Sequence, residues 1–464
     1  MRSVVVLLAL VGCGGHAPGP ASPTSPASPA VSPPIGAVQG PAPEATGARV
    51  LLVVTGYGGV REDITSTALA RDYCAGKLAV VDAVRASADA RFGCHSAAAV
   101  RSLGDVLATA KSELVVTDLD HVTSQWKAVR VDGHSFFEQP ATYPLVLAEG
   151  TARPDFAPHL THFILTGVTA ITRATGAACE ANGIAWLTKN LRPAFAGADY
   201  VHISNEVSLK PDCTYPTKNT YAFCTKEGDF QALLDLHANV IELTGNHTRD
   251  FGDEPFRKTL DWYKQHQMAT FGGGATPEAA NEPVILKLAD GKHLGIIGFN
   301  EQCPLKECAL KPGEVGANAY DSTKAKAAIA RIRGELGADF VMVTVQFREW
   351  DKPEPTRTQA AISHQLVDDG ADLVYGSQAH QLQWIEFYKG KPIFHGLGNL
   401  LFDQIHRIGV RQAFFVHHYF FHGRLVQSVP VFTFMADDRQ PTLATPDQAE
   451  EMKSIVFQDA LLYH

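Results

Sequence analysis

Gly376-Ser377-Gln378-Ala379-His380-Gln381 follows an apolar run at residues 372–375 and is the clearest indication of architecture in this chain. A short apolar run is typical of a buried strand, and the loop beyond such a strand is where α/β sheets carry functional side chains. A second run, at residues 240–243, leads into Gly245-Asn246-His247. Two histidines at strand ends with amide and carboxylate neighbours, Asp250 among them, predict one polar site at the edge of a sheet.

Working outward from these two strands, apolar runs alternate with helical stretches along most of the chain. Strands are expected at residues 162–167, 200–204, 240–243, 293–298, 340–345, 373–376, 392–395, 412–419 and 424–434. Helices are expected at residues 77–90, 183–195, 230–237, 255–267, 322–336 and 356–369. This alternation predicts a layered α/β fold with crossover connections, and the last two strands form an antiparallel hairpin.

The length of 464 residues exceeds what one hydrophobic core usually supports, so several parts are expected. The predicted divisions are a signal peptide at 1–13, a linker at 14–48, a small α/β segment at 49–150, a main domain at 158–440 and a C-terminal tail or helix at 441–464.

The N-terminus reads as an export signal, because the apolar run at residues 4–9 follows Arg2 and is too short to span a bilayer. Leu10-Val11-Gly12-Cys13 resembles the lipobox of bacterial lipoproteins, which implies lipidation of Cys13. A simple secretory signal is the alternative. Gly14 offers no inner-membrane retention cue, so we expect a lipid-anchored envelope protein, at the outer membrane rather than the inner one. The linker, rich in Pro, Ala and Ser, would act as a tether.

The remaining cysteines are expected in an oxidising compartment, where local loop pairs are the simplest arrangement. A zinc cluster is the rival interpretation, but no Cys-x-x-Cys occurs and the spacings are irregular. The predicted disulfides are Cys213 with Cys224, Cys303 with Cys308 and Cys74 with Cys94, which leaves Cys179 alone on a helix.

The net charge of −9, without any block of Lys and Arg, argues against a nucleic-acid partner. Some polar groups are interpreted as structural: Asp118, Asp120 and His121 as loop residues, 272–274 as a tight turn, and His417, His418 and His422 as hairpin residues that point to opposite faces.

Four strand ends carry the polar residues from which a site is expected. They are Asn205-Glu206, Gly245-Asn246-His247, Gln346-Phe347-Arg348-Glu349 and the stretch at 376–380. Carboxylate, carboxamide oxygen and neutral imidazole together suit a divalent metal with an open coordination position. Singly, each residue has an ordinary structural explanation, such as a helix cap for Asn205. Jointly, four polar strand ends in one sheet favour a site.

Over residues 162–404 the chain resembles the CapA capsule-synthesis (poly-γ-glutamate biosynthesis) family. The resemblance is carried by ordered motifs: Thr166-Gly167-Val168, Ser204-Asn205-Glu206, Thr244-Gly245-Asn246-His247, Gln346-Phe347-Arg348-Glu349, Gly376-Ser377-Gln378-Ala379-His380 and Gly396-Leu397-Gly398-Asn399. It implies a calcineurin-like metallophosphatase fold, an α/β/β/α sandwich.

Three positions depart from the family pattern. Typical members carry Asp where this chain has Val168, His where it has Gln346, and Gly-His-His-Pro-His where it has residues 376–380. A binuclear phosphatase centre normally needs that Asp as a hard anionic ligand. The departures therefore predict at most one divalent cation, of unspecified identity.

The resemblance also implies residue roles. His247 and His380 would act as general acid or base, with Arg173 and Arg348 pairing an anionic substrate group. The metal ligands would be Glu206, Asn246, His247 and His380, and substrate contacts would come from Asn205, Gln346, Glu349, Gln378 and Asn399.

The implied function is capsule or anionic-exopolymer biosynthesis, by metal-dependent hydrolysis or transfer on a phosphate or γ-glutamyl amide. The implied partners are the exopolymer or its precursor, the membrane through the lipid anchor, and capsule export machinery. A non-catalytic polymer-binding or export-scaffold lipoprotein with a degenerate metal site is the alternative. A phosphodiesterase is a third possibility. The strongest argument against it is Val168, which stands where typical family members carry Asp.

Overall fold

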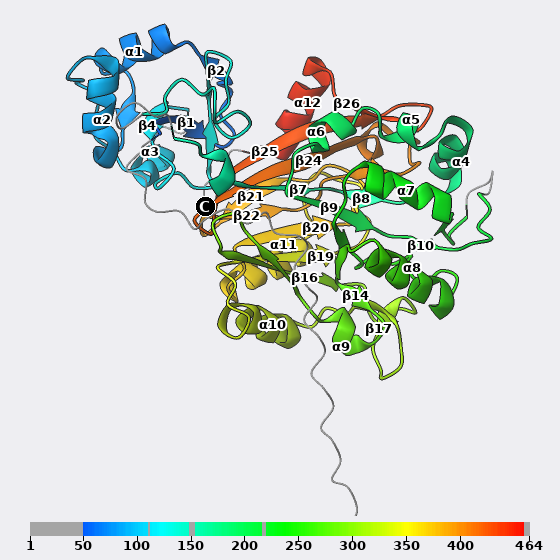
Figure 1. Ribbon diagram of the computed structural model, residues 1–464. Helices are drawn as coiled ribbons and strands as arrows, with labels where there is room; N and C mark the ends of the chain where they lie inside the picture. Colours follow the sequence, from blue (N-terminus) through cyan, green and yellow to red (C-terminus); the bar gives the residue numbers. More distant parts are fainter. Residues whose placement is uncertain (1–49, 110–111, 148–153, 216–219, 459–464) are drawn as a thin grey trace, which may run out of the picture. The chain divides into compact units, whose positions relative to one another are not determined.

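The computed structural model describes residues 50–109, 112–147, 154–215 and 220–458 (Figure 1). The predicted signal peptide, the linker and Cys13 lie outside the described residues. Among the described residues, no helix combines the length and the apolar character needed to cross a membrane.

The larger sheet has nine strands in the order β13-β12-β9-β7-β24-β25-β26, and off this path β8 pairs with β9 and β23 pairs with β8. From β13 to β7 the neighbours are parallel, so the carboxyl ends of β7, β9 and β12 lie at one edge. β24 and β25 form the predicted antiparallel hairpin. The bounds are β7 (Thr161–Leu165), β8 (Val168–Thr169), β9 (Tyr200–Asn205), β12 (Val240–Glu242), β13 (Ala269–Phe271), β23 (Asn399–Leu401), β24 (Gln412–Phe421), β25 (Arg424–Met435) and β26 (Pro441–Leu443).

The second sheet has six strands in the order β15-β16-β19-β20-β22-β21. Its central four strands are parallel, and the register places Asn300, Gln346 and Ser377 level with one another at their carboxyl ends. The bounds are β15 (Val284–Lys287), β16 (His293–Asn300), β19 (Phe340–Gln346), β20 (Leu373–Ser377), β21 (Ile385–Tyr388) and β22 (Lys391–Phe394).

The two sheets pack face to face because their strands alternate between two apolar faces. In β19, Phe340 and Met342 join a core cluster that also contains Phe163 and Leu165 of the larger sheet. The alternate residues of both sheets pack instead with residues of the helices. The α/β/β/α sandwich predicted from the sequence is therefore confirmed.

The outer helices of the two sheets come from different parts of the chain (Figure 1). The cluster outside the larger sheet includes residues of α4 (Arg173–Asn182), α5 (Ile184–Thr188), α6 (Arg192–Phe195), α7 (Glu227–Asp235) and α8 (Asp253–Gln265). The cluster outside the six-stranded sheet includes residues of α10 (Ser322–Gly334) and α11 (Arg357–Asp368).

Two predicted helices differ from the structure. The helix expected at 183–195 is split into α5 and α6, and Pro193 lies in the first turn of α6, where its missing N–H costs no hydrogen bond. The helix expected at 77–90 starts late, since β3 (Ala79–Val80) precedes α2 (Asp82–Phe92).

The N-terminal segment has its own four-stranded sheet, in the order β3-β4-β1-β5. It packs against the hairpin: Val426 belongs to its core cluster, and the Ala128 N–H donates to Gln427 Oε1 at 2.9 Å. Its further elements are β1 (Leu52–Gly56), β2 (Asp63–Ile64), α1 (Ser66–Cys74), α3 (Leu103–Thr109), β4 (Val115–Thr117), β5 (Trp126–Ala128) and β6 (Arg130–Val131).

The short elements that remain mostly lie in connections around the two sheets. They are η1 (Ala157–His159), β10 (Ser208–Leu209), β11 (Cys224–Thr225), β14 (Gly273–Gly274), α9 (Pro277–Ala280), β17 (Cys308–Ala309), β18 (Gly316–Asn318), η2 (Ile408–Val410) and α12 (Pro446–Val456). All three predicted disulfides are confirmed, and Cys179 is free and buried on α4.

Candidate functional site

A cluster of three carboxamides joins the carboxyl ends of the two sheets. The Nε2 of Gln346, at the end of β19, donates to Asn246 Oδ1 at 2.9 Å and to Gln378 Oε1 at 2.7 Å. Asn246 follows β12 of the larger sheet, whereas Gln346 and Gln378 come from β19 and the loop after β20. The structure therefore brings together three of the four polar strand ends that the sequence singled out.

The cluster is buried and only partly satisfied. Gln346 and Gln378 are each 1% exposed, and Gln346 Oε1 and Gln378 Nε2 have no hydrogen-bond partner. Gln378 and His380 have φ values of +81° and +55°, in the left-handed region that side chains other than glycine rarely adopt. Such backbone persists only where its surroundings hold it, and it concentrates at functional sites.

His380 has a defined tautomer, set by Asn399. The Nδ2 of Asn399 donates to the carbonyl oxygens of Val410, at 3.1 Å, and His380, at 3.3 Å, which fixes the orientation of the amide. Its Oδ1 therefore accepts from His380 Nδ1 at 2.8 Å. Burial lowers the pKa of His380 to about 4, although this hydrogen bond acts in the opposite direction. The Nε2 atom is left with a lone pair, 3.7 Å from Oε1 of Glu349.

His247 is oriented by a carboxylate. Its Nδ1 lies 2.7 Å from Asp250 Oδ2, and the same oxygen accepts the Phe223 N–H at 2.7 Å. The Phe223 ring packs on the imidazole with a centroid separation of 4.0 Å. Because Nδ1 donates to Asp250, Nε2 is the nitrogen that can exchange a proton, and the side chain is 15% exposed. The Phe402 ring lies 5.9 Å from the Phe223 ring and 5.3 Å from the His380 ring, centroid to centroid, so one aromatic cluster joins the two histidines.

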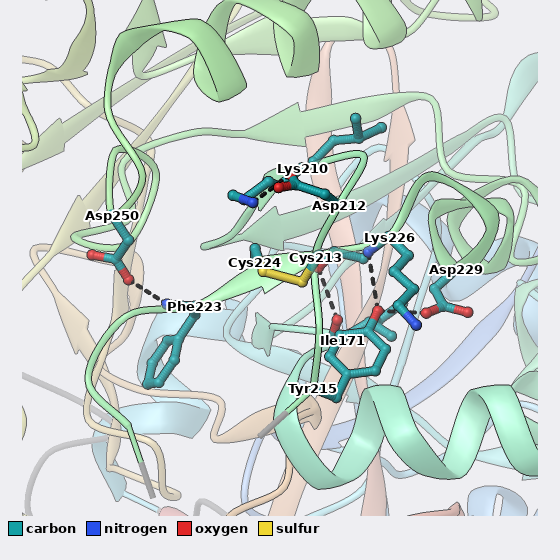
Figure 2. The surroundings of a disulfide bond; sticks show 12 residues. Ile171, Lys210, Asp212, Cys213, Tyr215, Phe223, Cys224, Lys226, Asp229 and Asp250 are labelled. Carbon is teal, nitrogen blue, oxygen red and sulfur yellow. Dashed lines mark hydrogen bonds and ion pairs between the residues drawn. A yellow bond between two sulfur atoms is a disulfide. The ribbon is translucent and has the colours of Figure 1, made fainter. Parts of the chain in front are cut away.

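Figure 2 shows how the backbone at Phe223 is held. The next residue, Cys224, is joined to Cys213, and Thr225 Oγ1 donates to the Ile171 carbonyl at 2.8 Å. The Lys226 N–H donates to the Tyr215 hydroxyl at 3.0 Å. The backbone of Phe223, which donates to Asp250, is therefore held by the disulfide of Cys224 and by the hydrogen bonds of Thr225 and Lys226.

Glu206 is a buried carboxyl at the end of β9. It is 2% exposed, and its Oε2 has no hydrogen-bond partner. Burial, with the neighbouring carboxylates of Glu349, Glu242 and Asp250, raises its pKa well above the usual range. A Cβ placed on Gly245 would lie 2.8 Å from the Glu206 Cα, so the Glu206 and Asn246 loops touch through a glycine.

Three predicted site residues lie outside the carboxamide cluster: two are bonded to partners inside the fold, and one is exposed at the rim. The Asn205 amide donates to the Val207 carbonyl and the Tyr263 hydroxyl, both at 2.7 Å, so it is used inside the fold. The Nε of Arg173 donates to both oxygens of Asp403, at 3.1 and 3.2 Å. The Arg348 side chain is 73% exposed and lies 3.7 Å from Glu301, at the rim.

The sequence placed Asp250 among the polar neighbours of His247 but gave it no specific role, and it gave none to Phe223 or Asp403. Asp250 lies three residues after His247, and that spacing was the available signal for a histidine–carboxylate pair. Asp403 lies four residues after Asn399, within the motif that runs to Gln404, but a pairing with Arg173 across 230 residues has no local signal. Phe223 carries no signal at all, because its backbone N–H makes the contact.

A binuclear metal centre does not fit this site. Val168 is 1% exposed and apolar, so it supplies no ligand at the position where the resemblance implies an Asp. Within the described ranges, no group of three or more His, Cys, Asp or Glu side chains is arranged to hold a metal ion.

The site leaves two buried oxygen acceptors that a single cation could satisfy. Glu206 Oε2 and Gln346 Oε1 are buried acceptors without a donor, and each such group costs about 1–3 kcal/mol unless a cation or water satisfies it. The lone pair on His380 Nε2 is also unused by the protein, apart from its approach to Glu349. Neutral oxygens dominate this donor set.

The family model described as "Bacterial capsule synthesis protein PGA_cap" matches residues 162–404. The PGA biosynthesis protein CapA of Bacillus subtilis (strain 168) is 26% identical over 227 residues, which cover 48% of this chain and 59% of that protein. The capsule biosynthesis protein CapA of Bacillus anthracis is 26% identical over 228 residues, covering 48% and 55%. The chain thus spans less than two thirds of the length of these curated relatives.

Solved structures with a similar arrangement include the Haemophilus influenzae NAD nucleotidase NadN, with a TM-score of 0.37 and 10% identity over 64% of this chain and 62% of that one. The sulfate thiohydrolase SoxB of Thermus thermophilus has a TM-score of 0.35 and 9% identity over 66% and 60%. The family match alone covers more than half of the sequence, in the domain that carries the strand-end site. The chain therefore belongs to the bacterial capsule synthesis protein PGA_cap family.

Proposed function

We propose that this protein takes part in the synthesis, export or attachment of an anionic cell-surface polymer of the poly-γ-glutamate class. In this proposal its strand-end site acts by hydrolysis or transfer on a γ-glutamyl amide or a phosphate of the polymer or its precursor. Family membership and the names of the curated relatives support the polymer class. The observation that carries the chemistry is the His247–Asp250 pair, which directly follows Asn246 of the carboxamide cluster.

His247 is the acid–base group in this proposal. Asp250 holds the proton on Nδ1, so Nε2 can take a proton from an attacking hydroxyl and return it to a leaving group. His380 stays neutral at pH 7 because burial lowers its pKa to about 4, and it offers an Nε2 lone pair. Arg348, exposed at the rim, would pair with an anionic substrate group.

One divalent cation would be held by Glu206, Asn246, Gln346 and His380. When bound, such a cation polarises a phosphoryl or acyl oxygen of a substrate. Glu349 lies near both His380 and Glu206 and would orient the substrate at the exposed side.

A non-catalytic role in polymer binding or export is the second candidate. One observation favours it: Gln346 Nε2 donates to Asn246 Oδ1, which is a ligand in the catalytic proposal, and to Gln378 Oε1. In this case the carboxamides would serve as hydrogen-bonding groups for the polymer.

The two roles are separated by incubating the purified protein with poly-γ-glutamate and with simple phosphoesters, with and without added divalent cations. The catalytic proposal expects new chain ends or phosphate from the wild type and a strong loss in His247→Gln with unchanged thermal stability. Polymer retention without product, equal in wild type and His247→Gln, would replace it with the binding role.

We further propose that Cys13 anchors the protein to the cell envelope, at the outer membrane rather than the inner one. The lipobox resemblance and the Pro-rich linker support this location. Metabolic labelling with a fatty-acid analogue should mark the wild type and not Cys13→Ser. Equal labelling of both proteins would exclude lipidation at this residue.

A further inference from the structure

We propose that Arg173 is a positioning residue that sets the spacing between His247 and His380 by packing against two aromatic rings. This inference rests on the proposed function, in which the two histidines act at one site, and it adds a residue that acts through its neighbours. It gives Arg173 a role different from the substrate contact that the family resemblance implies.

The Arg173 guanidinium is committed to partners inside the fold. Its Nε donates to Asp403 Oδ2 at 3.1 Å and to Oδ1 at 3.2 Å, and Nη2 also donates to Oδ1. The other terminal nitrogen, Nη1, donates to the Thr220 carbonyl at 3.3 Å. The two side chains of the ion pair are 13% and 10% exposed. A charge-assisted pair with two parallel contacts of this kind fixes the plane of the guanidinium.

Two phenylalanine rings lie against this guanidinium. Its central carbon lies 4.6 Å from the ring centroid of Phe223 and 5.0 Å from that of Phe402. The two rings meet edge to face, with centroids 5.9 Å apart, and they are buried. A guanidinium packs well on aromatic rings because it is planar and weakly hydrated, unlike a lysine ammonium. Arg173, Phe223 and Phe402 therefore form one buried unit, the arginine–aromatic cluster.

Each ring of the arginine–aromatic cluster also contacts one histidine. The Phe223 ring lies 4.0 Å from the His247 imidazole, and the Phe402 ring lies 5.3 Å from the His380 imidazole, centroid to centroid. The two histidines follow β12 and β20, which belong to different sheets. The guanidinium therefore contacts both of the rings that support the two histidines.

Asp403 also holds the start of α4. Its Oδ2 accepts the Ala174 N–H at 3.2 Å, whereas the N-cap residue, Thr172, makes no side-chain cap hydrogen bond. Asp403 thus satisfies one of the N–H groups that a helix leaves free at its start. Arg173 has a φ of +45°, a conformation that persists only where surrounding contacts hold it. The ion pair and the start of α4 are therefore one fixed arrangement.

The loop that carries Asp403 also carries groups that support His380. Phe402 directly precedes Asp403, and Asn399, four residues earlier, accepts from His380 Nδ1 at 2.8 Å. Because Arg173 fixes Asp403, it holds this loop where His380 finds both its ring contact and its hydrogen-bond acceptor. Loss of the guanidinium should therefore displace the supports of both histidines together.

The test is the ¹H–¹⁵N NMR spectrum of the imidazole rings in the full-length protein, with signals assigned through His247→Gln and His380→Gln. Arg173→Lys keeps the positive charge but loses the planar group, so we expect it to shift the ring signals of both histidines. Arg333→Met is the matched control, because it breaks an ion pair with Asp372, directly before β20 and at the end of that strand away from the site. It should leave both signals in place.

A second variant tests the coupling without removing the arginine. Phe402→Leu takes away the ring beside His380, so the His380 signal should shift through the lost contact alone. The decisive signal is that of His247, whose imidazole packs on Phe223. We expect it to shift as well, because Arg173 contacts both rings. A His247 signal unchanged in Phe402→Leu would overturn the coupling.

Kinetics separate positioning from substrate binding. In the product assay of the proposed function, Arg173→Lys should lower kcat by about tenfold or more and leave KM nearly unchanged, because the guanidinium acts through His247 and His380. A raised KM with unchanged kcat would assign Arg173 to substrate binding and overturn the proposal.

The NMR results decide the positioning role even where no product forms. Unchanged ring signals in Arg173→Lys, a shift of only one histidine, or equal shifts in Arg333→Met would each overturn it. Shifts of both signals in Arg173→Lys alone, without product from the wild type, would support the positioning role while the acid–base proposal fails.

Discussion

The imidazole of His247 and the backbone N–H of Phe223 donate to the same oxygen, Oδ2 of Asp250, each at 2.7 Å. The Phe223 ring also packs on the imidazole at a tilt, and the following residue, Cys224, is joined to Cys213 by a disulfide. A backbone contact therefore positions the carboxylate that positions the histidine. This relationship makes the acid–base pair dependent on a loop that contributes no catalytic side chain.

Replacement of Asp250 by Asn should uncouple this pair. The amide can donate as well as accept, so the imidazole is no longer restricted to the tautomer with its proton on Nδ1. In the catalytic proposal we expect product formation to fall by about a hundredfold or more, which is the contribution of a positioned acid or base. Initial rates in parallel with thermal unfolding measure it. Rates equal to those of the wild type would show that Asp250 does not orient the base.

Removal of the Cys213–Cys224 disulfide should disturb His247 at a distance. The bond closes a loop with a sequence separation of 11, so replacing both cysteines by Ser should lower the free energy of unfolding by about 2–4 kcal/mol. It should also shift the ¹H–¹⁵N NMR signals of the His247 ring. Cys74→Ser with Cys94→Ser, which opens the disulfide of the N-terminal segment, should cause comparable destabilisation without that shift. Ring signals that move equally in both double variants would mean that the loop has no specific role.

Substitution of Gly245 by Ala should damage the site through its backbone. The added Cβ would meet the Glu206 Cα at 2.8 Å, which backbone atoms cannot avoid by changing a rotamer. We expect a loss of about 1–3 kcal/mol of stability, as for other overpacked positions, together with weaker cation binding. Gly228→Ala on α7, where a Cβ meets nothing within 4 Å, should be neutral or stabilising in the same chemical denaturation experiment. A Gly245→Ala protein as stable as the Gly228→Ala protein would contradict the contact.

Acid should destabilise the protein through a histidine pair on β7 and β24. His162 Nε2 lies 2.6 Å from His417 Nδ1, and burial lowers the pKa values of the two residues to about 4 and about 3. The unfolded histidines take up protons below about pH 6.5, whereas the folded ones stay neutral. Their contribution to stability is therefore complete above pH 6.5 and is lost as the pH falls toward 4.

The unfolding free energy should fall by up to about 1.4 kcal/mol per pH unit of acidification for each histidine. His417→Gln should flatten the dependence of unfolding free energy on pH between 6.5 and 5 in urea titrations. His95→Gln, at a fully exposed imidazole in the N-terminal segment, should leave the slope as it is. Parallel slopes for His417→Gln and the wild type would show that the buried pair does not titrate on unfolding.

The layered fold was predictable because period-two and helical patterns of apolar residues determine which face of each element is buried. The disulfides were predictable because local loop pairs were the simplest arrangement. The split between α5 and α6 was not foreseen, since the helical pattern continues through Pro193 and only the proline marks the new start.

The strand ends of the site were predictable, but the use of each side chain was not. Glu206, Gln346, Gln378 and His380 were identified from their positions after buried strands, and the structure brings them to one edge. Asn205 donates to the Tyr263 hydroxyl, and Arg173 pairs with Asp403. Neither pairing could be predicted, because the partners are distant in sequence and become neighbours only in the folded chain.

The central claim is that Glu206 and its neighbours hold one cation beside His247. Equilibrium dialysis of the wild type and Glu206→Gln against a Ca²⁺ and Mg²⁺ series tests it most directly, because the substitution removes the buried carboxylate while retaining its shape. We predict one bound cation per wild-type chain and binding weakened by about tenfold or more in the variant. Equal binding by the two proteins, or no bound cation in either, would contradict the claim.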